Sequence, residues 1–290
     1  MTNKTDFRFG NNVVSDAANA SSTAAHIFDT VYTFNIDGGN LISFRNNTTK
    51  VLDFSYQGGI DHVNSGASTA AHSQSLNLNW GSDTNKTSSG QQSVVIGNNN
   101  TASAYNSFAI GASCLVSASN SFATGVNNQV TQTNSFVSGK DASVPNKCTS
   151  GIGGAAFSSR GDVQVMTAVI KAATTDATQT TMNAEGTDYV IPADTTWAFS
   201  ALVVARSDET DGNLSAVWRL EGCLARDESS STVIVGSVTK TVIADGAAAA
   251  WDVTATADDT NEALAIQVTG EAATNIRWVA KLDISQVGYA

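Results

Sequence analysis

A pattern of fourteen residues repeats through the middle of the chain and constrains its fold more than any other feature. The segments SVVIG, NSFAIG, NSFATG and NSFVSG align with their glycines 14 residues apart. The aligned positions are the glycines Gly97, Gly111, Gly125 and Gly139 and, in the last three segments, the serines Ser107, Ser121 and Ser135. A unit this short cannot bury a core alone, so the units must stack and share one.

Each unit carries the pattern of a strand between two turns. Phe108 and Ile110 alternate with Ser107 and Ala109, a period of two that is typical of a strand with one apolar face. Asn and Gly at the unit ends tolerate left-handed backbone. The pattern predicts a coil of two short strands, with Phe and Ile among the side chains of a narrow bore. Because such a bore buries little surface, association with further copies is expected.

Residues 91–153 resemble the head repeat of trimeric autotransporter adhesins, the YadA-like left-handed parallel β-roll, whose units read NSxAxG at this step. The same roll occurs in bacteriophage tail fibres. The resemblance implies a homotrimer. A right-handed β-helix of the tailspike depolymerase type needs coils longer than 14 residues and is disfavoured. The absence of a coiled-coil stalk and of a membrane-anchor barrel disfavours a complete autotransporter adhesin.

Charge divides the chain into two parts. The formal net charge is −11, and residues 161–290 carry all of it as 18 acidic against seven basic side chains. This sign excludes binding to nucleic acid through phosphate neutralisation and disfavours anionic membrane surfaces. No apolar stretch approaches the roughly 18 residues of a membrane span. Three cysteines without CxxC spacing, Cys114, Cys148 and Cys223, predict buried thiols in a reducing cytosol.

The C-terminal part is predicted to be an antiparallel sandwich or jelly roll. Its expected strands are 163–170, 197–206, 216–221, 232–242 and 276–284. Trp197, Trp218 and Trp278 fall on the apolar phase of these strands and are expected in the core, whereas Trp251 lies outside them. Blocks such as RGDVQ and IRWVAKLDISQV resemble the C-terminal domain of bacteriophage tail fibre and tail structural proteins.

The chain is therefore expected to be all-β, a homotrimeric fibre with three regions. Residues 1–90 form a β-rich shaft or attachment region, in which 41–56 is predicted to contain two strands. Residues 91–159 form the β-roll, and residues 160–290 form the antiparallel β-sandwich tip.

The resemblance implies a structural, receptor-binding tail fibre of the virion, assembled in the host cytoplasm. Its expected partners are other tail or baseplate proteins and a polysaccharide or protein receptor on the bacterial surface, with neither nucleic acid binding nor membrane insertion. Glycan recognition by three weak sites would gain avidity from their linkage. Two alternatives stay open. One is a tail-borne polysaccharide depolymerase, and the other is a purely architectural segment or a fragment of a bacterial trimeric adhesin.

No catalytic site is expected. Gly-x-Ser-x-Gly, Walker and zinc-ligand spacings are absent, and all three histidines precede residue 73. Surface recognition is expected in loops 207–213 and 226–231. The candidate residues are Asp208, Asp211, Asn213, Arg226, Asp227 and Trp251. No cofactor is expected, although an axial metal at His26 or His72, or Ca²⁺ in loops 208–213 and 258–261, stays open. The tripeptide Arg160-Gly161-Asp162 is interpreted as a chance match to a cell-adhesion motif.

Overall fold

The computed structural model describes residues 29–31, 40–46, 49–55, 60–62, 75–80, 88–208, 210–229, 231–246 and 250–289. The chain divides into two compact units, Met1–Ser117 and Ala118–Ala290. Throughout the described ranges the regular elements are strands, without any helix. The prediction of an all-β protein is confirmed. His26 and His72, the candidates for an axial metal, lie outside the described residues.

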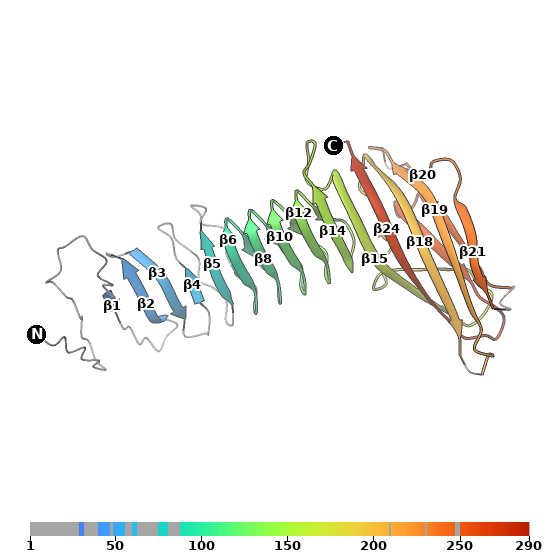
Figure 1. Ribbon diagram of the computed structural model, residues 1–290, viewed down its shortest axis with the longest axis horizontal. Coiled ribbons are helices and arrows are strands. Elements are labelled where there is room, and N and C mark those ends of the chain that lie inside the picture. The colour runs from blue at the N-terminus through green and yellow to red at the C-terminus, as the bar shows by residue number, and fades with distance from the viewer. Residues whose placement is uncertain are drawn as a thin grey trace, which may run out of the picture. The chain divides into compact units, whose positions relative to one another are not determined.

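The first unit passes from an antiparallel to a parallel sheet. Its first four strands pair antiparallel in chain order; they are β1 (Asp29–Val31), β2 (Asn40–Asn46), β3 (Thr49–Ser55) and β4 (Ile60–His62). β2 and β3 confirm the two strands predicted in 41–56. Three parallel strands follow side by side (Figure 1); they are β5 (Leu76–Trp80), β6 (Val94–Asn98) and β8 (Phe108–Ala112).

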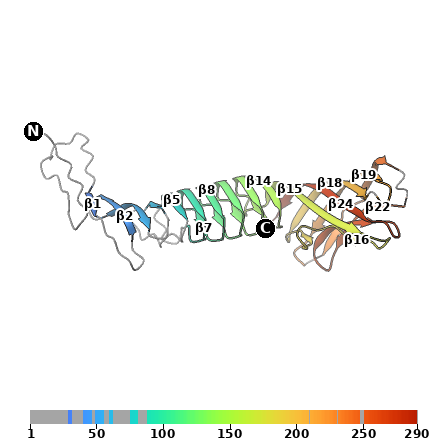
Figure 2. The same cartoon turned by 90° about the horizontal axis from the view of Figure 1, so that it is seen from below.

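Coils of the predicted kind occur in both units. Short strands lie on the opposite side of each coil from the longer ones (Figure 2). In the first unit they are β7 (Thr101–Ala102) and β9 (Leu115–Val116). The second unit has long strands β10 (Phe122–Val126), β12 (Phe136–Lys140) and β14 (Thr149–Gly154) and short strands β11 (Gln129–Val130) and β13 (Ser143–Val144). Phe122 lies opposite Phe136, and Gly139 opposite Gly153, so the 14-residue step is the parallel register. The predicted β-roll is confirmed.

The expectation that the phenylalanines lie in the bore of the roll is wrong. Ser107 and Ala109 are buried, whereas Phe108 and Phe136 point outward and remain 39% and 37% exposed. The buried apolar residues of the bore are Val95, Ala102, Ala109, Val116, Ala123, Val130, Val137 and Val144. Two strands joined by tight turns enclose room for small side chains and valines only. The phenylalanines therefore occupy the other phase of the alternation.

Polar groups inside the roll are satisfied by side chains that repeat with the coils. The Ser107 hydroxyl donates to the Ala104 carbonyl at 2.6 Å. The Asn128 side chain donates to the Gly139 carbonyl at 2.9 Å and accepts from the Ala142 amide at 2.8 Å. Such bonds offset the cost of burying amide and hydroxyl groups. They explain why Ser and Asn recur at inward positions of an otherwise apolar bore.

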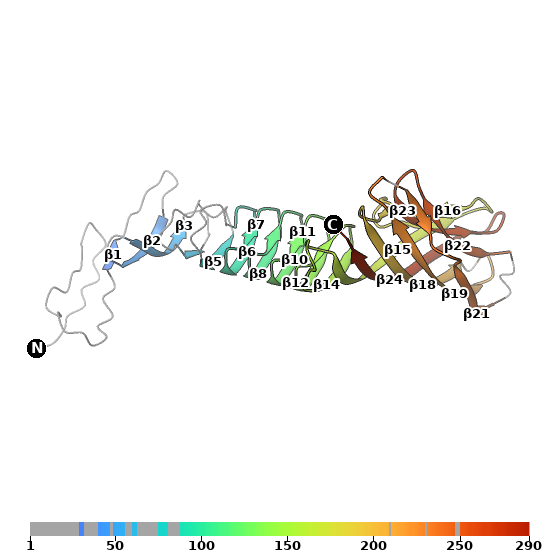
Figure 3. The same cartoon turned by 90° about the horizontal axis from the view of Figure 1, so that it is seen from above.

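The C-terminal domain is a sandwich of two antiparallel sheets. The main sheet consists of β15 (Val163–Thr174), β24 (Ile276–Gly288), β18 (Thr195–Ser207) and β19 (Ser215–Arg226), with β20 (Thr232–Ile234) and β21 (Thr239–Asp245) both paired to β19. The second sheet consists of β16 (Thr180–Thr181), β17 (Tyr189–Val190), β22 (Asp252–Asp258) and β23 (Ala263–Thr269). Figure 3 shows β16, β22 and β23 in a separate layer from β15, β24 and β18.

The core of the sandwich is largely as predicted. Trp197, Trp218 and Trp278 are buried, and the rings of Trp218 and Trp278 stack with centroids 5.7 Å apart. The predicted strand over 232–242 is wrong, because the chain turns at Gly236 with a φ of +80° and forms two strands. The long strands β22 and β23 were not among the expected ones.

Tyr189 joins the last coils of the roll to the sandwich. Its ring is buried, and its hydroxyl lies 2.9 Å from that of Thr149 on β14. Beside it, Asn146 and Val190 exchange two hydrogen bonds of 2.8 and 2.9 Å. Together with the antiparallel pairing of β14 and β15, these bonds attach the sandwich to the roll within the second unit.

Alkaline pH is expected to weaken this joint. Burial raises the pKa of Tyr189 from 10.0 to about 12. The neutral phenol is favoured in the folded state, so the stabilisation is complete below pH 10 and is lost as pH rises towards 12. The pKa difference corresponds to at most about 3 kcal/mol. Urea unfolding at pH 9 and pH 11.5 should show a larger loss of stability in the wild type than in Tyr189→Phe. Equal losses in the two proteins would contradict this role.

Candidate functional site

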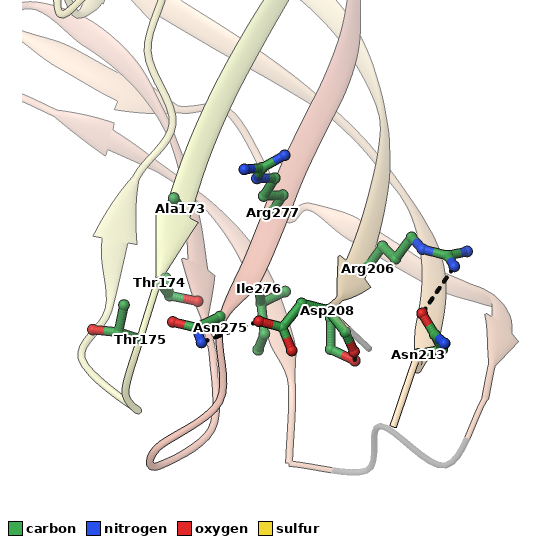
Figure 4. Close-up of a pocket in the computed structure, with 10 residues that line it drawn as sticks. Ala173, Thr174, Thr175, Arg206, Asp208, Asn213, Asn275, Ile276 and Arg277 are labelled. Atoms are coloured by element: carbon green, nitrogen blue, oxygen red, sulfur yellow. Dashed lines mark hydrogen bonds between the residues drawn. The ribbon is translucent and has the colours of Figure 1, made fainter. Parts of the chain in front are cut away.

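A pocket of about 610 Å³ lies at one end of the main sheet of the sandwich (Figure 4). Its wall comes from the end of β15, the end of β18 with the loop that follows, and the start of β24. The polar residues around it are Thr174, Thr175, Arg206, Ser207, Asp208, Asn213, Asn275 and Arg277. Antiparallel register brings these segments together, since Arg277 lies opposite Arg206 on one side and Ala173 on the other.

The loop after β18 is held in shape by its own carboxylates. Asp208 accepts a hydrogen bond from the Asp211 amide at 3.0 Å, and this bond lowers the pKa of the Asp208 carboxyl group. Asn275 crosses from the neighbouring loop: its amide donates to Asp211 at 2.7 Å and its side chain to Asp208 at 3.2 Å. The wall of the pocket is therefore a hydrogen-bonded structure that spans two loops.

Two arginines supply the positive charge of the pocket. Arg206 donates to the side-chain oxygen of Asn213 at 3.0 Å (Figure 4). Among the residues that the structure describes, Arg277 makes no hydrogen bond or ion pair, and no carboxylate pairs with Arg206. Both side chains are exposed. They remain available to an incoming anion.

The structure brings together three of the six predicted recognition residues, Asp208, Asp211 and Asn213, in the loop beside the pocket. Arg226 and Asp227 lie at the opposite end of β19, about 36 Å away along an extended strand of this length. There Arg226 donates to the Ile191 carbonyl at 2.9 Å and pairs with Glu262 at 3.4 Å. The two loops proposed from the sequence therefore cannot form one site within a chain.

The prediction that Trp251 is a surface-recognition residue is wrong. Its ring is 4% exposed and packs against Trp278 with centroids 5.8 Å apart, while its indole N–H donates to Glu271 at 3.3 Å. The ring fills space between the two sheets. It has no free face on which a sugar could stack.

The adhesion-like tripeptide has a structural role. The Asp162 carboxylate is buried and accepts backbone hydrogen bonds from Phe157, Ser158 and Ser159 at 3.1, 2.8 and 3.0 Å. Arg160 donates to Gln129 at 2.8 Å. These bonds hold the loop between β14 and β15 against the roll.

Cysteine and metal chemistry add little to the site. Cys114 is buried as predicted, whereas Cys148 and Cys223 are half-buried, so full burial is wrong for these two.

Among the described residues, no three His, Cys, Asp or Glu side chains gather in a way that could hold a metal ion. The oxygens of Asp258 in loop 258–261 accept hydrogen bonds from Thr260 and Asn261.

The sequence did not predict three residues of the pocket, Arg206, Arg277 and Asn275. Arg277 lies within the strand expected over 276–284, but no local pattern shows that Arg206 lies opposite it. Only the register of β18 and β24 provides that information.

A match to one family model supports the β-roll. Residues 88–113 match two copies of the YadA head domain repeat, and the chain therefore contains YadA-like head repeats. No curated protein matches the chain. Among solved structures, the tailspike protein of the Acinetobacter phage vB_ApiP_P1 is similar at 11% identity and a TM-score of 0.21, over 74% of this chain and 53% of that one. The chain thus spans about half the length of that tailspike. The described residues include no helix that could cross a bilayer.

Proposed function

We propose that this protein is a homotrimeric tail fibre of a bacteriophage virion that attaches to glycans of the bacterial surface through its C-terminal sandwich. The observation that carries the proposal is the stack of 14-residue coils, which match the YadA head repeat at residues 88–113. The roll acts as a rigid spacer, and the sandwich presents loops for recognition.

The outward phenylalanines support the homotrimer. Phe108, Phe122 and Phe136 occupy equivalent positions in successive coils, and the rings of Phe122 and Phe136 touch with centroids 5.3 Å apart. Apolar rings in rows on a sheet surface are costly in water and are typical of an interface. In a trimer they pack against other copies and supply the apolar core that the narrow bore lacks.

Recognition without catalysis is the favoured mechanism. A glycosidase needs a carboxylic acid that keeps its proton near neutral pH. The pKa of Asp208, the carboxyl group in the pocket wall, is lowered by the Asp211 amide and so shifts the opposite way. Three linked pockets binding one polymer gain avidity because the second and third contacts occur at high effective concentration. No cofactor is part of this mechanism.

Adhesion of the labelled full chain to a panel of bacterial strains tests the function. We expect binding to some strains that is competed by polysaccharide purified from the same strain, and that survives EDTA. Absence of binding to any strain would favour the architectural alternative. Loss of polysaccharide viscosity on incubation with the protein would favour a depolymerase.

A further inference from the structure

Basic residues of the acidic C-terminal domain gather on one face of its main sheet. Residues 161–290 contain seven basic side chains among 18 acidic ones. Five of the seven alternate with inward-facing residues along their strands and point away from the second sheet. They are Lys171 on β15, Arg206 on β18, Arg219 on β19, and Arg277 and Lys281 on β24. We call this set the basic face.

Strand register places the five cations in three successive rows at the pocket end of the sheet. The first row is Ala173, Arg277, Arg206 and Ser215; the second is Lys171, Val279, Val204 and Val217; the third is Val169, Lys281, Leu202 and Arg219. Rows on one face are about 7 Å apart and strands about 5 Å apart. A negatively charged chain lying across the sheet would meet several of these cations at once.

The first row is unfavourable in the free protein. Arg206 and Arg277 lie directly opposite each other, and like charges in this relation destabilise a sheet. Among the described residues, Asp283 neutralises Lys281 at 2.8 Å, but no carboxylate pairs with the other four cations. An anion bound between the two arginines would relieve their repulsion.

The lining of the pocket indicates the class of ligand. A guanidinium group matches a carboxylate with two parallel hydrogen bonds. Thr175, Asn213 and Asn275 add polar groups of the kind that hold sugar hydroxyls. No aromatic ring is among the described residues that line the pocket, so a sugar would be held by charge and hydrogen bonds instead of by stacking.

We propose that the pocket and the basic face bind an acidic polysaccharide, with Arg206 and Arg277 holding the carboxylate of one sugar unit. This inference rests on the proposed attachment to surface glycans and names their class. It also accounts for how a domain with a net charge of −11 could bind an acidic polymer, because its cations are concentrated where the polymer lies.

Calorimetric titration of the full chain with polygalacturonate oligosaccharides tests the inference. We expect binding to polygalacturonate that weakens as salt rises, and at least tenfold weaker binding to its methyl ester, which keeps the rings but lacks the charge. Arg206→Gln/Arg277→Gln should weaken binding at least tenfold. The control Lys147→Gln/Lys240→Gln removes two charges outside the basic face and should change affinity less than twofold.

Several results would overturn the site. The first is the absence of binding to polygalacturonate, and the second is an affinity for the methyl ester equal to that for polygalacturonate. The third is an equal loss of affinity in both double variants. The fourth is an affinity for dextran sulfate equal to that for polygalacturonate, which would indicate attraction to any polyanion without recognition of the carboxylate. A melting temperature of Arg206→Gln/Arg277→Gln that is equal to or higher than that of the wild type would exclude misfolding as the cause of lost binding.

Adhesion assays with the same variants separate this inference from the proposed function. If the wild type and Arg206→Gln/Arg277→Gln adhere equally to cells, the pocket inference fails and the proposed function stands. If the wild type binds polygalacturonate through the arginines but adheres to no strain, the proposed function fails and the site stands.

Discussion

Replacing Phe122 and Phe136 together by Glu is expected to dissociate the proposed homotrimer of 30.0 kDa chains into single chains. Each outward ring contributes about 1.5–3 kcal/mol when it is buried against another copy. The double variant removes this contribution in every chain and places carboxylates of the same sign together across the interface. Both effects oppose association.

Light scattering during size-exclusion chromatography measures this outcome directly. The matched control is Phe157→Glu, because Phe157 is 81% exposed in a loop outside the strands of the roll. We expect it to keep a mass of about three chains, while far-ultraviolet circular dichroism of both variants keeps its strand signal. A wild-type mass of one chain, or an unchanged mass in the double variant, would refute the interface.

Substituting Gly125 by Ala is expected to destabilise the roll strongly. The φ of Gly125 is +110°, and an added Cβ would lie 2.1 Å from the Gly139 carbonyl oxygen of the next coil. The backbone strain costs about 1–3 kcal/mol, and the clash requires the coils to move apart. A total loss of about 3 kcal/mol or more would lower the melting temperature by roughly 6–12 °C.

Gly186→Ala is the control that separates strain from the clash. Its φ is +75°, but no atom lies within 4 Å of the added Cβ. We expect a loss of only about 1–2 kcal/mol from strain. Thermal unfolding of the three proteins at one concentration makes the comparison. An equal loss of stability in the two variants would show that contact with the next coil does not prevent a larger side chain at position 125.

For the roll, the repeat predicted the architecture but not the side that faces inward. The 14-residue step of the glycines became the register of the parallel strands, with Gly139 opposite Gly153. Alternation alone leaves two phases, one with Ser107 and Ala109 and the other with Phe108 and Ile110. Hydrophobicity favoured the second phase for the bore, whereas the space between two closely spaced strands admits only the first.

For the sandwich, alternation located the long strands where one phase is clearly apolar. The last strand is the clearest case: Trp278 is buried as predicted, and Leu282 and Ile284 are buried on the same face. Prediction from alternation failed at Gly236, where the backbone conformation ends a strand within an apparently continuous pattern. It also failed at Trp251, which lies outside the expected strands and is buried against Trp278 of the main sheet.

For the candidate site too, the sequence predicted one part and only the fold placed the rest. Turn chemistry correctly grouped Asp208, Asp211 and Asn213 in one loop, because residues close in sequence must be close in space. It could not place Arg226 at the far end of β19, or Asn275 and Arg277 beside the loop.

The sequence by itself determined the all-β class, the coil step and the concentration of negative charge in residues 161–290. These properties depend on local backbone preference, on periodicity and on counting. Only the tertiary structure decided that the phenylalanines face outward, that Trp251 is buried and that Arg206 lies opposite Arg277. The physical reason is that these relations depend on bore width, sheet packing and register, which are set by contacts between residues far apart in the chain.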